Sequence, residues 1–314
     1  MIKLKVLTAL CLITLLSSVA ASVMAEEPSH NPRIGVLLLA HGGKTRWNDQ
    51  VVVLATRVNL HYPTEAAFGM ASKPAIEAAI KRLVERGAKE IVAVPLFVSS
   101  HSAIIESVRY LLGLRRDMPP EYEHYARMSH GHGSGEHDGY HTLQMSADLM
   151  APIHLPVPVK MTSALDDHPL VADILLDRAL AISTEPSHEV VIVVAHGPVK
   201  DGENERWLAD MRRLAERMRP KSHFKEIEIF SVRDDAPEPQ RTQVAKELRA
   251  LVSKTTGAGK RVLIVPLLIS YGGIEEGIKK RLEGLPYKIS DCGLLPDERL
   301  VQWVAAQVEA SRQK

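Results

Sequence analysis

Continuous apolar runs alternate with amphipathic stretches along most of the chain. Uninterrupted runs such as VVIVVA (190–195) and VLIVPLLI (262–269) predict strands of a parallel sheet that is covered on both faces. A helical pattern with a closing glycine, PAIEAAIKRLVERGA (74–88), is typical of the segments between such strands. The alternation predicts an α/β fold with two similar doubly wound parallel-sheet lobes.

Three sequence segments, called phrases below, recur in the same order in the two halves of the chain. The first is an apolar strand that ends on Ala-His-Gly, the second joins Val-Pro-Leu to a Ser-containing break and a helix, and the third places Leu and an acidic turn before an amphipathic helix. The pairs lie at residues 35–43 and 189–197, 87–113 and 259–284, and 163–180 and 292–308. This order indicates an internal duplication.

The polar STEPSH stretch (183–188) predicts the boundary between an N-terminal lobe over residues 33–183 and a C-terminal lobe over residues 188–312. The first half is longer because it carries an insertion at about residues 117–156. In open α/β sheets of this kind, ligands bind beyond the carboxyl ends of the strands.

The first 25 residues have the pattern of a secretory signal peptide. A basic start precedes an apolar run, and the small residues Val23 and Ala25 stand at the −3 and −1 positions of a cleavage site. The alternative is a membrane anchor, but the apolar run is shorter than the ~20 residues that a spanning helix needs. We therefore expect an exported, periplasmic protein with no membrane span after cleavage.

Composition excludes several classes of function. A formal net charge of +1 and an aromatic content of 4% argue against nucleic-acid binding. Cys292 is the single cysteine after residue 25, so no internal disulfide is expected. The sequence lacks G-x-G-x-x-G, Walker-type, G-x-S-x-G and His-Glu-x-x-His motifs. Because a duplicated chain supplies in one molecule what two single halves would supply, we predict a monomer.

Two histidines follow apolar strands of the first half at the edge where ligands are expected. His41 directly follows GVLLLA, and His101 stands in PLFVSSHS. A single histidine at a strand end is usually a packed, hydrogen-bonded residue without a functional role. Two histidines at the same edge of a sheet instead predict that both take part in one functional site. The second half repeats the first as His196 and has Tyr271 in place of the second. A phenol, with a pKa of about 10, is a poor ligand for a divalent metal near neutral pH, so we expect the second half to be mainly structural and a wall for the substrate.

The insertion is rich in histidine and glycine, which predicts a flexible, metal-binding loop with a loose, exchangeable site. The alternative is a solvated polar loop without function. Its histidines and acidic residues are His124, His130, His132, His137, His141, Glu136 and Asp138.

These motifs together resemble the sirohydrochlorin cobaltochelatase family, the CbiX-type class II chelatases. The resemblance rests on a strand ending in Ala-His-Gly, a P-x-I-x-x-A-I helix (74–80), GA-x-x-I-x-x-x-PLF (87–97) followed by a histidine, and LDDHPLVADILLDRA (165–179), and it covers residues 33–310 as two copies. It implies two α/β lobes with a cleft between them. It also implies insertion of Co²⁺, or in relatives Fe²⁺ or Ni²⁺, into a tetrapyrrole such as sirohydrochlorin, with no cofactor besides the divalent metal substrate.

The family's metal-handling histidines fall on His41 and His101. Imidazole also suits a general base near neutral pH, and we assign one pyrrole proton to a histidine and the other to Glu106, one helical turn past His101. Cationic side chains would bind the carboxylates of the substrate, and glycines would let a planar ring approach the backbone. The substrate-binding candidates are Gly42, Gly43, Lys44, Arg46 and Arg109.

Two other functions stay open at this point. The first is an exported, non-catalytic carrier of a metal or a tetrapyrrole that uses the same histidines. The second is an inactive relative that is kept for an interaction with a partner. Stoichiometric binding without turnover would indicate the carrier.

Overall fold

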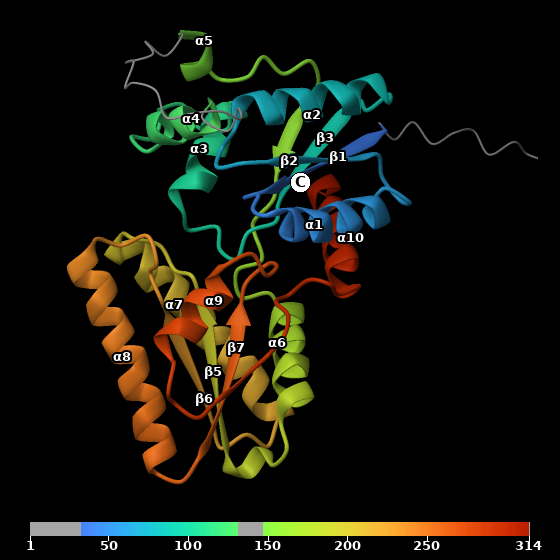
Figure 1. Ribbon diagram of the computed structural model, residues 1–314. Helices are drawn as coiled ribbons and strands as arrows, with labels where there is room; N and C mark the ends of the chain where they lie inside the picture. The colour runs from blue at the N-terminus through green and yellow to red at the C-terminus, as the bar shows by residue number, and fades with distance from the viewer. Residues whose placement is uncertain (1–32, 131–146, 314) are drawn as a thin grey trace, which may run out of the picture. The chain divides into compact units, whose positions relative to one another are not determined.

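The computed structural model describes residues 33–130 and 147–313. It contains two four-stranded parallel sheets with the same strand order (Figure 1). The first sheet has the order β2-β1-β3-β4, with β1 Ile34–Ala40, β2 Thr64–Phe68, β3 Glu90–Pro95 and β4 Val159–Met161. The second has the order β6-β5-β7-β8, with β5 Glu189–Ala195, β6 Glu226–Ser231, β7 Arg261–Leu267 and β8 Lys288–Ile289. The α/β fold and the duplication are confirmed.

Helices connect the strands in both halves. In the first half they are α1 Thr45–Val58, α2 Lys73–Glu85, α3 Ala103–Leu111, α4 Tyr122–His130, α5 Ala147–Met150 and α6 Pro169–Ile182. In the second half they are α7 Asp201–Met218, α8 Glu238–Gly257, α9 Ile274–Arg281 and α10 Arg299–Arg312. None of the helices in the described part of the chain is long and apolar enough to cross a membrane.

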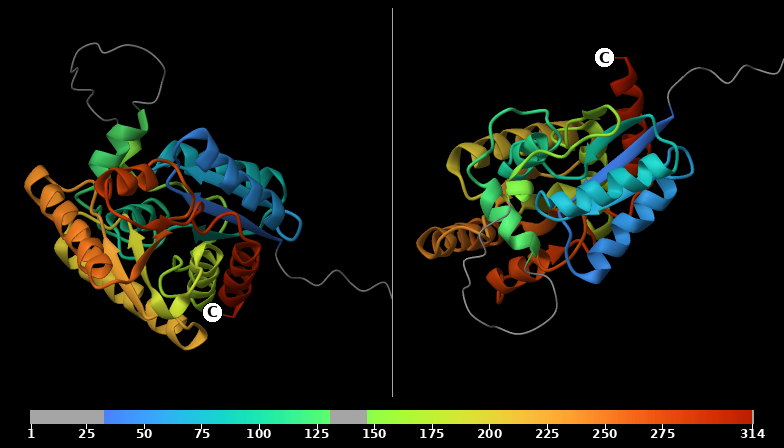
Figure 2. Two further views of the ribbon diagram at one scale, coloured as in Figure 1. Left: turned by 60° about the horizontal axis from the view of Figure 1, so that its bottom comes forward. Right: turned by 90° about the horizontal axis from the view of Figure 1, so that it is seen from above.

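Each sheet is covered by helices on both faces (Figure 2). Alternate residues of β1 belong to different cores: Val36 and Leu38 pack in the cluster with α1 and α10, whereas Leu37 and Leu39 pack in the cluster with α2 and α3. Successive side chains of a strand point to opposite faces, so a strand between two helix layers is apolar throughout. This explains the uninterrupted runs in the sequence.

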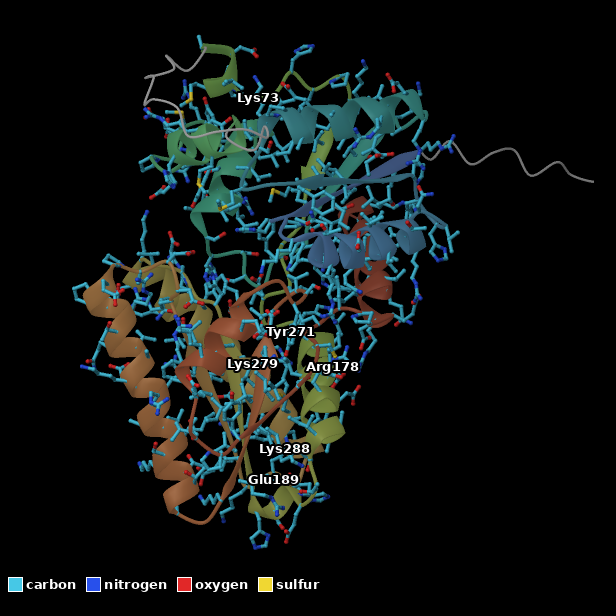
Figure 3. All side chains as sticks on the ribbon, in the orientation of Figure 1. Lys73, Arg178, Glu189, Tyr271, Lys279 and Lys288 are labelled. Atoms are coloured by element: carbon cyan, nitrogen blue, oxygen red, sulfur yellow. The ribbon has the colours of Figure 1, made fainter. Side chains whose placement is uncertain are left out.

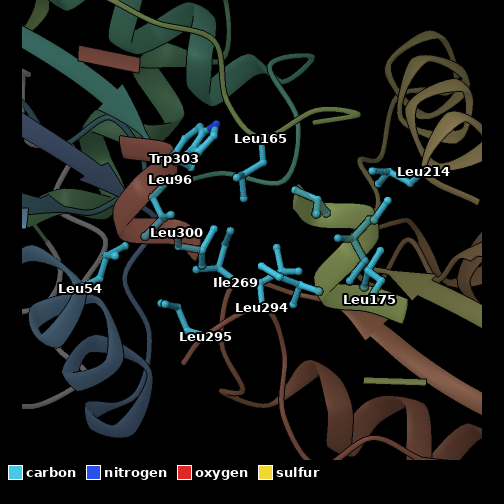
Figure 4. Packing of buried hydrophobic residues seen from close by; sticks show 14 of the residues in the cluster. Leu54, Leu96, Leu165, Leu175, Leu214, Ile269, Leu294, Leu295, Leu300 and Trp303 are labelled. Carbon is cyan, nitrogen blue, oxygen red and sulfur yellow. The ribbon is translucent and has the colours of Figure 1, made fainter. Parts of the chain in front are cut away.

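The largest core is continuous through both halves. It joins β1 and β3 to β5 and β7 through α1, α6, α7 and α10, and Figure 4 shows some of its members, among them Leu175 of α6 and Leu300 and Trp303 of α10. Trp303 is 1% exposed. Burying a large apolar side chain contributes about 1.5–3 kcal/mol, so this shared core holds the two halves together.

The two halves exchange one helix. Helix α6 precedes the predicted boundary at 183–188 but packs against β7 and α7, and α10 packs against β3 and α1. Polar contacts accompany both exchanges: Lys221 Nζ lies 2.6 Å from Asp173 Oδ1, and Lys160 Nζ donates to the Ser311 carbonyl at 3.1 Å. Helices α6 and α10 both lie in the third repeated phrase, so the exchange is reciprocal.

Part of the insertion is helical, although a loop was predicted there. Helix α4 runs from Tyr122 to His130 and includes His124. Tyr122 and Ala126, one turn apart, are both buried, and glycine enters the sequence only after them, so the loop prediction was wrong for this stretch. Residues 131–146, which contain His132, His137 and His141, lie outside the described residues.

Candidate functional site

The two candidate histidines leave the same edge of the first sheet. Strands β1 and β3 are parallel neighbours in which Leu39 pairs with Pro95, and the Leu96 N–H donates to the Leu39 carbonyl at 2.8 Å. His41 follows the end of β1 by one residue, and His101 follows the end of β3 by six. The carboxyl ends of two adjacent strands thus carry both imidazoles, as the sequence predicts.

The ring of His41 is exposed, and one of its two nitrogens is hydrogen-bonded to the backbone. Its Nδ1 lies 2.8 Å from the Gly42 carbonyl oxygen. A carbonyl oxygen only accepts, so this contact requires a proton on Nδ1 and leaves the Nε2 lone pair free in the neutral ring. A histidine fixed in this tautomer is suited to bind a metal through Nε2.

The two glycines after His41 serve the local geometry. Gly42 has a φ of +79°, a left-handed conformation that favours glycine. The backbone of Gly43 is held at both polar atoms by Asn48, which accepts from its N–H at 2.9 Å and donates to its carbonyl at 3.1 Å. A Cβ on Gly43 would lie 3.2 Å from Trp47 Cγ, so the indole packs directly on bare backbone. Their predicted contact with a planar substrate remains a prediction.

The indole of Trp47 also contacts the second half of the chain. A Cβ on Gly272, in the loop after β7, would lie 3.0 Å from Trp47 Cδ1. Gly272 directly follows Tyr271, the counterpart of His101. The loop after β1 in the first half and the loop after β7 in the second half therefore share one tryptophan.

Serines brace the His101 loop on several sides. The His101 N–H donates to Ser99 Oγ at 3.1 Å, and Ser102 caps α3 by accepting from the Ile105 N–H at 3.4 Å. Ser100 donates to both carboxylate oxygens of Asp166, through its N–H at 2.5 Å and its hydroxyl at 2.8 Å. The loop is therefore held by hydrogen bonds within itself and to Asp166, and His101 itself is half-buried.

Helix α7 reaches the same loop from the second half. Trp207 Nε1 donates to the His101 carbonyl at 2.9 Å, and Asp210 Oδ2 lies 3.5 Å from Ser99 Oγ. Asp210 is 4% exposed, and burial raises the pKa of this carboxyl, an effect that Arg213 and His101 partly oppose. Sequence reasoning missed Trp207 and Asp210, because no local motif marks a helix that contacts a loop more than a hundred residues away.

Glu106, the predicted second proton acceptor, takes part in an ion-pair network. It accepts from Arg115 at 2.6 Å, and Arg109 Nε lies 3.8 Å from its other oxygen. Lys44 and Arg46 are exposed at the start of α1. Nothing in these contacts tests the proton-accepting role of Glu106 or the substrate-binding roles of the three cations, which stay predictions.

The second half presents different groups at the equivalent edge. His196 Nε2 lies 3.4 Å from Asp235 Oδ2, and the His196 carbonyl accepts from the Arg233 N–H at 2.6 Å. The hydroxyl of Tyr271 (Figure 3) donates to the Ser290 carbonyl, and burial raises the pKa of this phenol well above its ordinary value. Tyr271 is thus a neutral, hydrogen-bonded group at this position.

Two further observations define what the described residues offer a metal. Across residues 33–130 and 147–313, no three His, Cys, Asp or Glu side chains gather as a metal site, so a metal held by His41 and His101 would need its remaining ligands from elsewhere. Two hollows of about 390 Å³, one beside α1 and β2 and one beside α8 and β8, contain neither histidine. The cleft implied by the resemblance stays a prediction.

The fold defines a class of protein. A structure described as SirB from Bacillus subtilis with Fe³⁺ matches with a TM-score of 0.57 and 16% identity, covering 88% of this chain and 94% of that one. A sirohydrochlorin chelatase SirB structure in complex with cobalt matches with a TM-score of 0.52 at the same identity and coverage. At this identity the likeness shows the fold alone, which is a chelatase-type two-lobed α/β fold.

Sequence comparison gives the family. The CbiX family model matches residues 35–181. The sirohydrochlorin cobaltochelatase of Saccharolobus solfataricus is 31% identical over 86 residues, which cover 27% of this chain and 67% of that protein. The enzyme of the same name from Sulfolobus acidocaldarius is 42% identical over 69 residues, and the chain spans 56% of its length. The chain belongs to the CbiX family.

Proposed function

We propose that this protein inserts a divalent metal into a tetrapyrrole such as sirohydrochlorin, with Co²⁺ as the first candidate metal and Fe²⁺ or Ni²⁺ as alternatives. The observation that carries the proposal is the placement of His41 and His101 at the same edge of two adjacent strands. The relatives named sirohydrochlorin cobaltochelatase support the substrate and the reaction.

In the proposed reaction, the metal ion enters the macrocycle as two pyrrole N–H protons leave it. Nε2 of His41 binds the ion, because Nδ1 is committed to the Gly42 carbonyl. The ring of His101 supplies a second ligand, and pyrrole nitrogens take the remaining positions. As the ion passes to the pyrrole nitrogens, the histidine that it leaves accepts one proton, and Glu106 accepts the other.

The second half has a supporting role in this proposal. The phenol of Tyr271, hydrogen-bonded to the Ser290 carbonyl, stands where the first half has an imidazole.

Three cations of the first half bind the substrate in this proposal. Lys44, Arg46 and Arg109 pair with substrate carboxylates, as Arg and Lys commonly do. We further propose that residues 1–25 direct export to the periplasm and that His130, His132, His137 and His141 capture metal at low concentration.

The test is anaerobic absorbance of the purified protein with sirohydrochlorin and Co²⁺. Loss of an outer-shell partner of a metal ligand costs about 10–100-fold, so loss of a ligand in His41→Ala or His101→Ala is expected to lower the insertion rate by at least about 100-fold. His61→Ala is the matched control, because His61 is an exposed histidine of the same half. Retained turnover in both site variants contradicts the proposal. Stoichiometric Co²⁺ binding by a wild-type protein without turnover replaces it with the carrier function.

A further inference from the structure

We propose that Trp207 and Asp210, both on α7, are positioning residues that hold His101 from the second half of the chain. This inference deepens the proposed function, on which it rests for the role of His101 as a metal ligand. It assigns to the second half a task in the site beyond forming a wall.

Both main-chain polar groups of His101 are connected to α7. The carbonyl accepts directly from Trp207 Nε1 at 2.9 Å. The N–H donates to Ser99 Oγ at 3.1 Å, and Ser99 Oγ in turn lies 3.5 Å from Asp210 Oδ2. With the peptide groups on either side of its Cα fixed, His101 can vary only through its side-chain torsions.

The connection through Asp210 is buried. Ser99 is 2% exposed and Asp210 is 4% exposed. Arg213, one turn further along α7, contacts the other carboxylate oxygen. Because these groups are buried, water does not compete for their hydrogen bonds, and the bonds keep their geometry. The longer Ser99–Asp210 distance makes Trp207 the stronger of the two connections.

A reciprocal contact exists on the other side of the duplication. Trp47 of α1 packs on Gly272 in the loop after β7, as Trp207 of α7 bonds to the loop after β3. In each half, the helix after the first strand thus carries a tryptophan that reaches the opposite half. Only the loop reached by Trp207 carries an imidazole, so this contact is the one that positions a ligand.

The experiment measures Co²⁺ binding without tetrapyrrole, in wild type, Trp207→Phe, His101→Ala and the double variant. The phenylalanine keeps an aromatic ring but removes the indole N–H. We expect the dissociation constant of the His101-dependent Co²⁺ site, and the KM for Co²⁺ in turnover, to rise about tenfold in Trp207→Phe, as for other outer-shell partners. Ser99→Ala should give a smaller rise in the same direction.

Trp303→Phe is the matched control. Its indole is buried in α10, and its N–H has no hydrogen-bond partner within the described part of the chain, so the same substitution removes no bond there and should leave Co²⁺ binding unchanged. In the His101→Ala background, Trp207→Phe should have no further effect. An additional loss in that background, or an unchanged dissociation constant in Trp207→Phe alone, overturns the inference. A wild type whose Co²⁺ binding depends on His101 and on Trp207, but which shows no turnover, contradicts the proposed function and leaves the positioning role intact.

Discussion

Gly272→Ala is expected to be destabilising in the wild type and stabilising when Trp47 is absent. Gly272 does not have a left-handed φ, so its backbone accepts an alanine. What opposes the substitution is the indole of Trp47, which lies on Gly272 from the other half of the chain. A double-mutant cycle with Trp47→Ala isolates that contact.

The magnitude follows from three distances. The new methyl would lie 3.0, 3.4 and 3.5 Å from Cδ1, Cβ and Cγ of Trp47, whereas relaxed carbon contacts are about 3.5–4.0 Å. Overpacking by a methyl costs about 1–3 kcal/mol, and replacing glycine in a compatible backbone gains about 0.4–1 kcal/mol by restricting the unfolded chain. The net cost in the wild type is therefore about 1 kcal/mol. With Trp47→Ala, the sign reverses to a gain of about 0.5 kcal/mol.

The assay is urea unfolding of the four proteins, followed by circular dichroism, because a change of 1 kcal/mol shifts the Tm of a chain this large by only about 2–4 °C. Gly202→Ala is the control: a Cβ there has no described atom within 4 Å, so its effect should be the same with and without Trp47. An equal effect of Gly272→Ala in the two backgrounds would refute the contact between the halves.

Three further substitutions probe the scaffold. Burial alone would raise the pKa of Glu189, but hydrogen bonds from residues 183–184 outweigh it and hold that pKa below the ordinary value of a glutamate. The stability advantage of wild type over Glu189→Gln at pH 7 should therefore shrink in urea titrations once the pH falls below that ordinary value, about 4.3, and vanish below the lowered pKa. Arg178→Met removes donors to the Gly293 and Pro296 carbonyls, at 3.1 and 2.9 Å, and should cost about 2–3 kcal/mol of unfolding free energy. Gly293→Ala, whose Cβ would lie 2.4 Å from the Leu268 carbonyl oxygen, should lower the yield of folded protein more than either.

Most of the fold could be predicted from the repeated phrases of the sequence. A strand that is buried on two faces is apolar throughout, and this composition is visible locally in the sequence. The apolar faces of α6 and α10 are equally visible in the sequence. Their destinations are not, since periodicity tells which side of a helix is buried but not which sheet buries it. The exchange of these helices between the halves could be found only in three dimensions.

The candidate site, too, could be predicted from the sequence only in part. The positions of His41 and His101 were predictable because each follows an apolar strand along the sequence, by one residue after β1 and by six after β3. The pairing of Glu106 with Arg115 was not, because these residues are joined by a turn after α3 that has no clear signature. Trp207 and Asp210 resemble ordinary helix residues, and only their contact with a loop of the other half gives them a role.

The helix exchange has a consequence for how the protein is made. Residues leave the ribosome in order, and domains generally fold as they emerge. Here the four strands of the first sheet are complete at Met161, but α10, which covers one of its faces, begins only at Arg299. The first lobe therefore matures last. A nonsense mutation just before α10 would leave both candidate histidines in place and still disable the lobe that carries them.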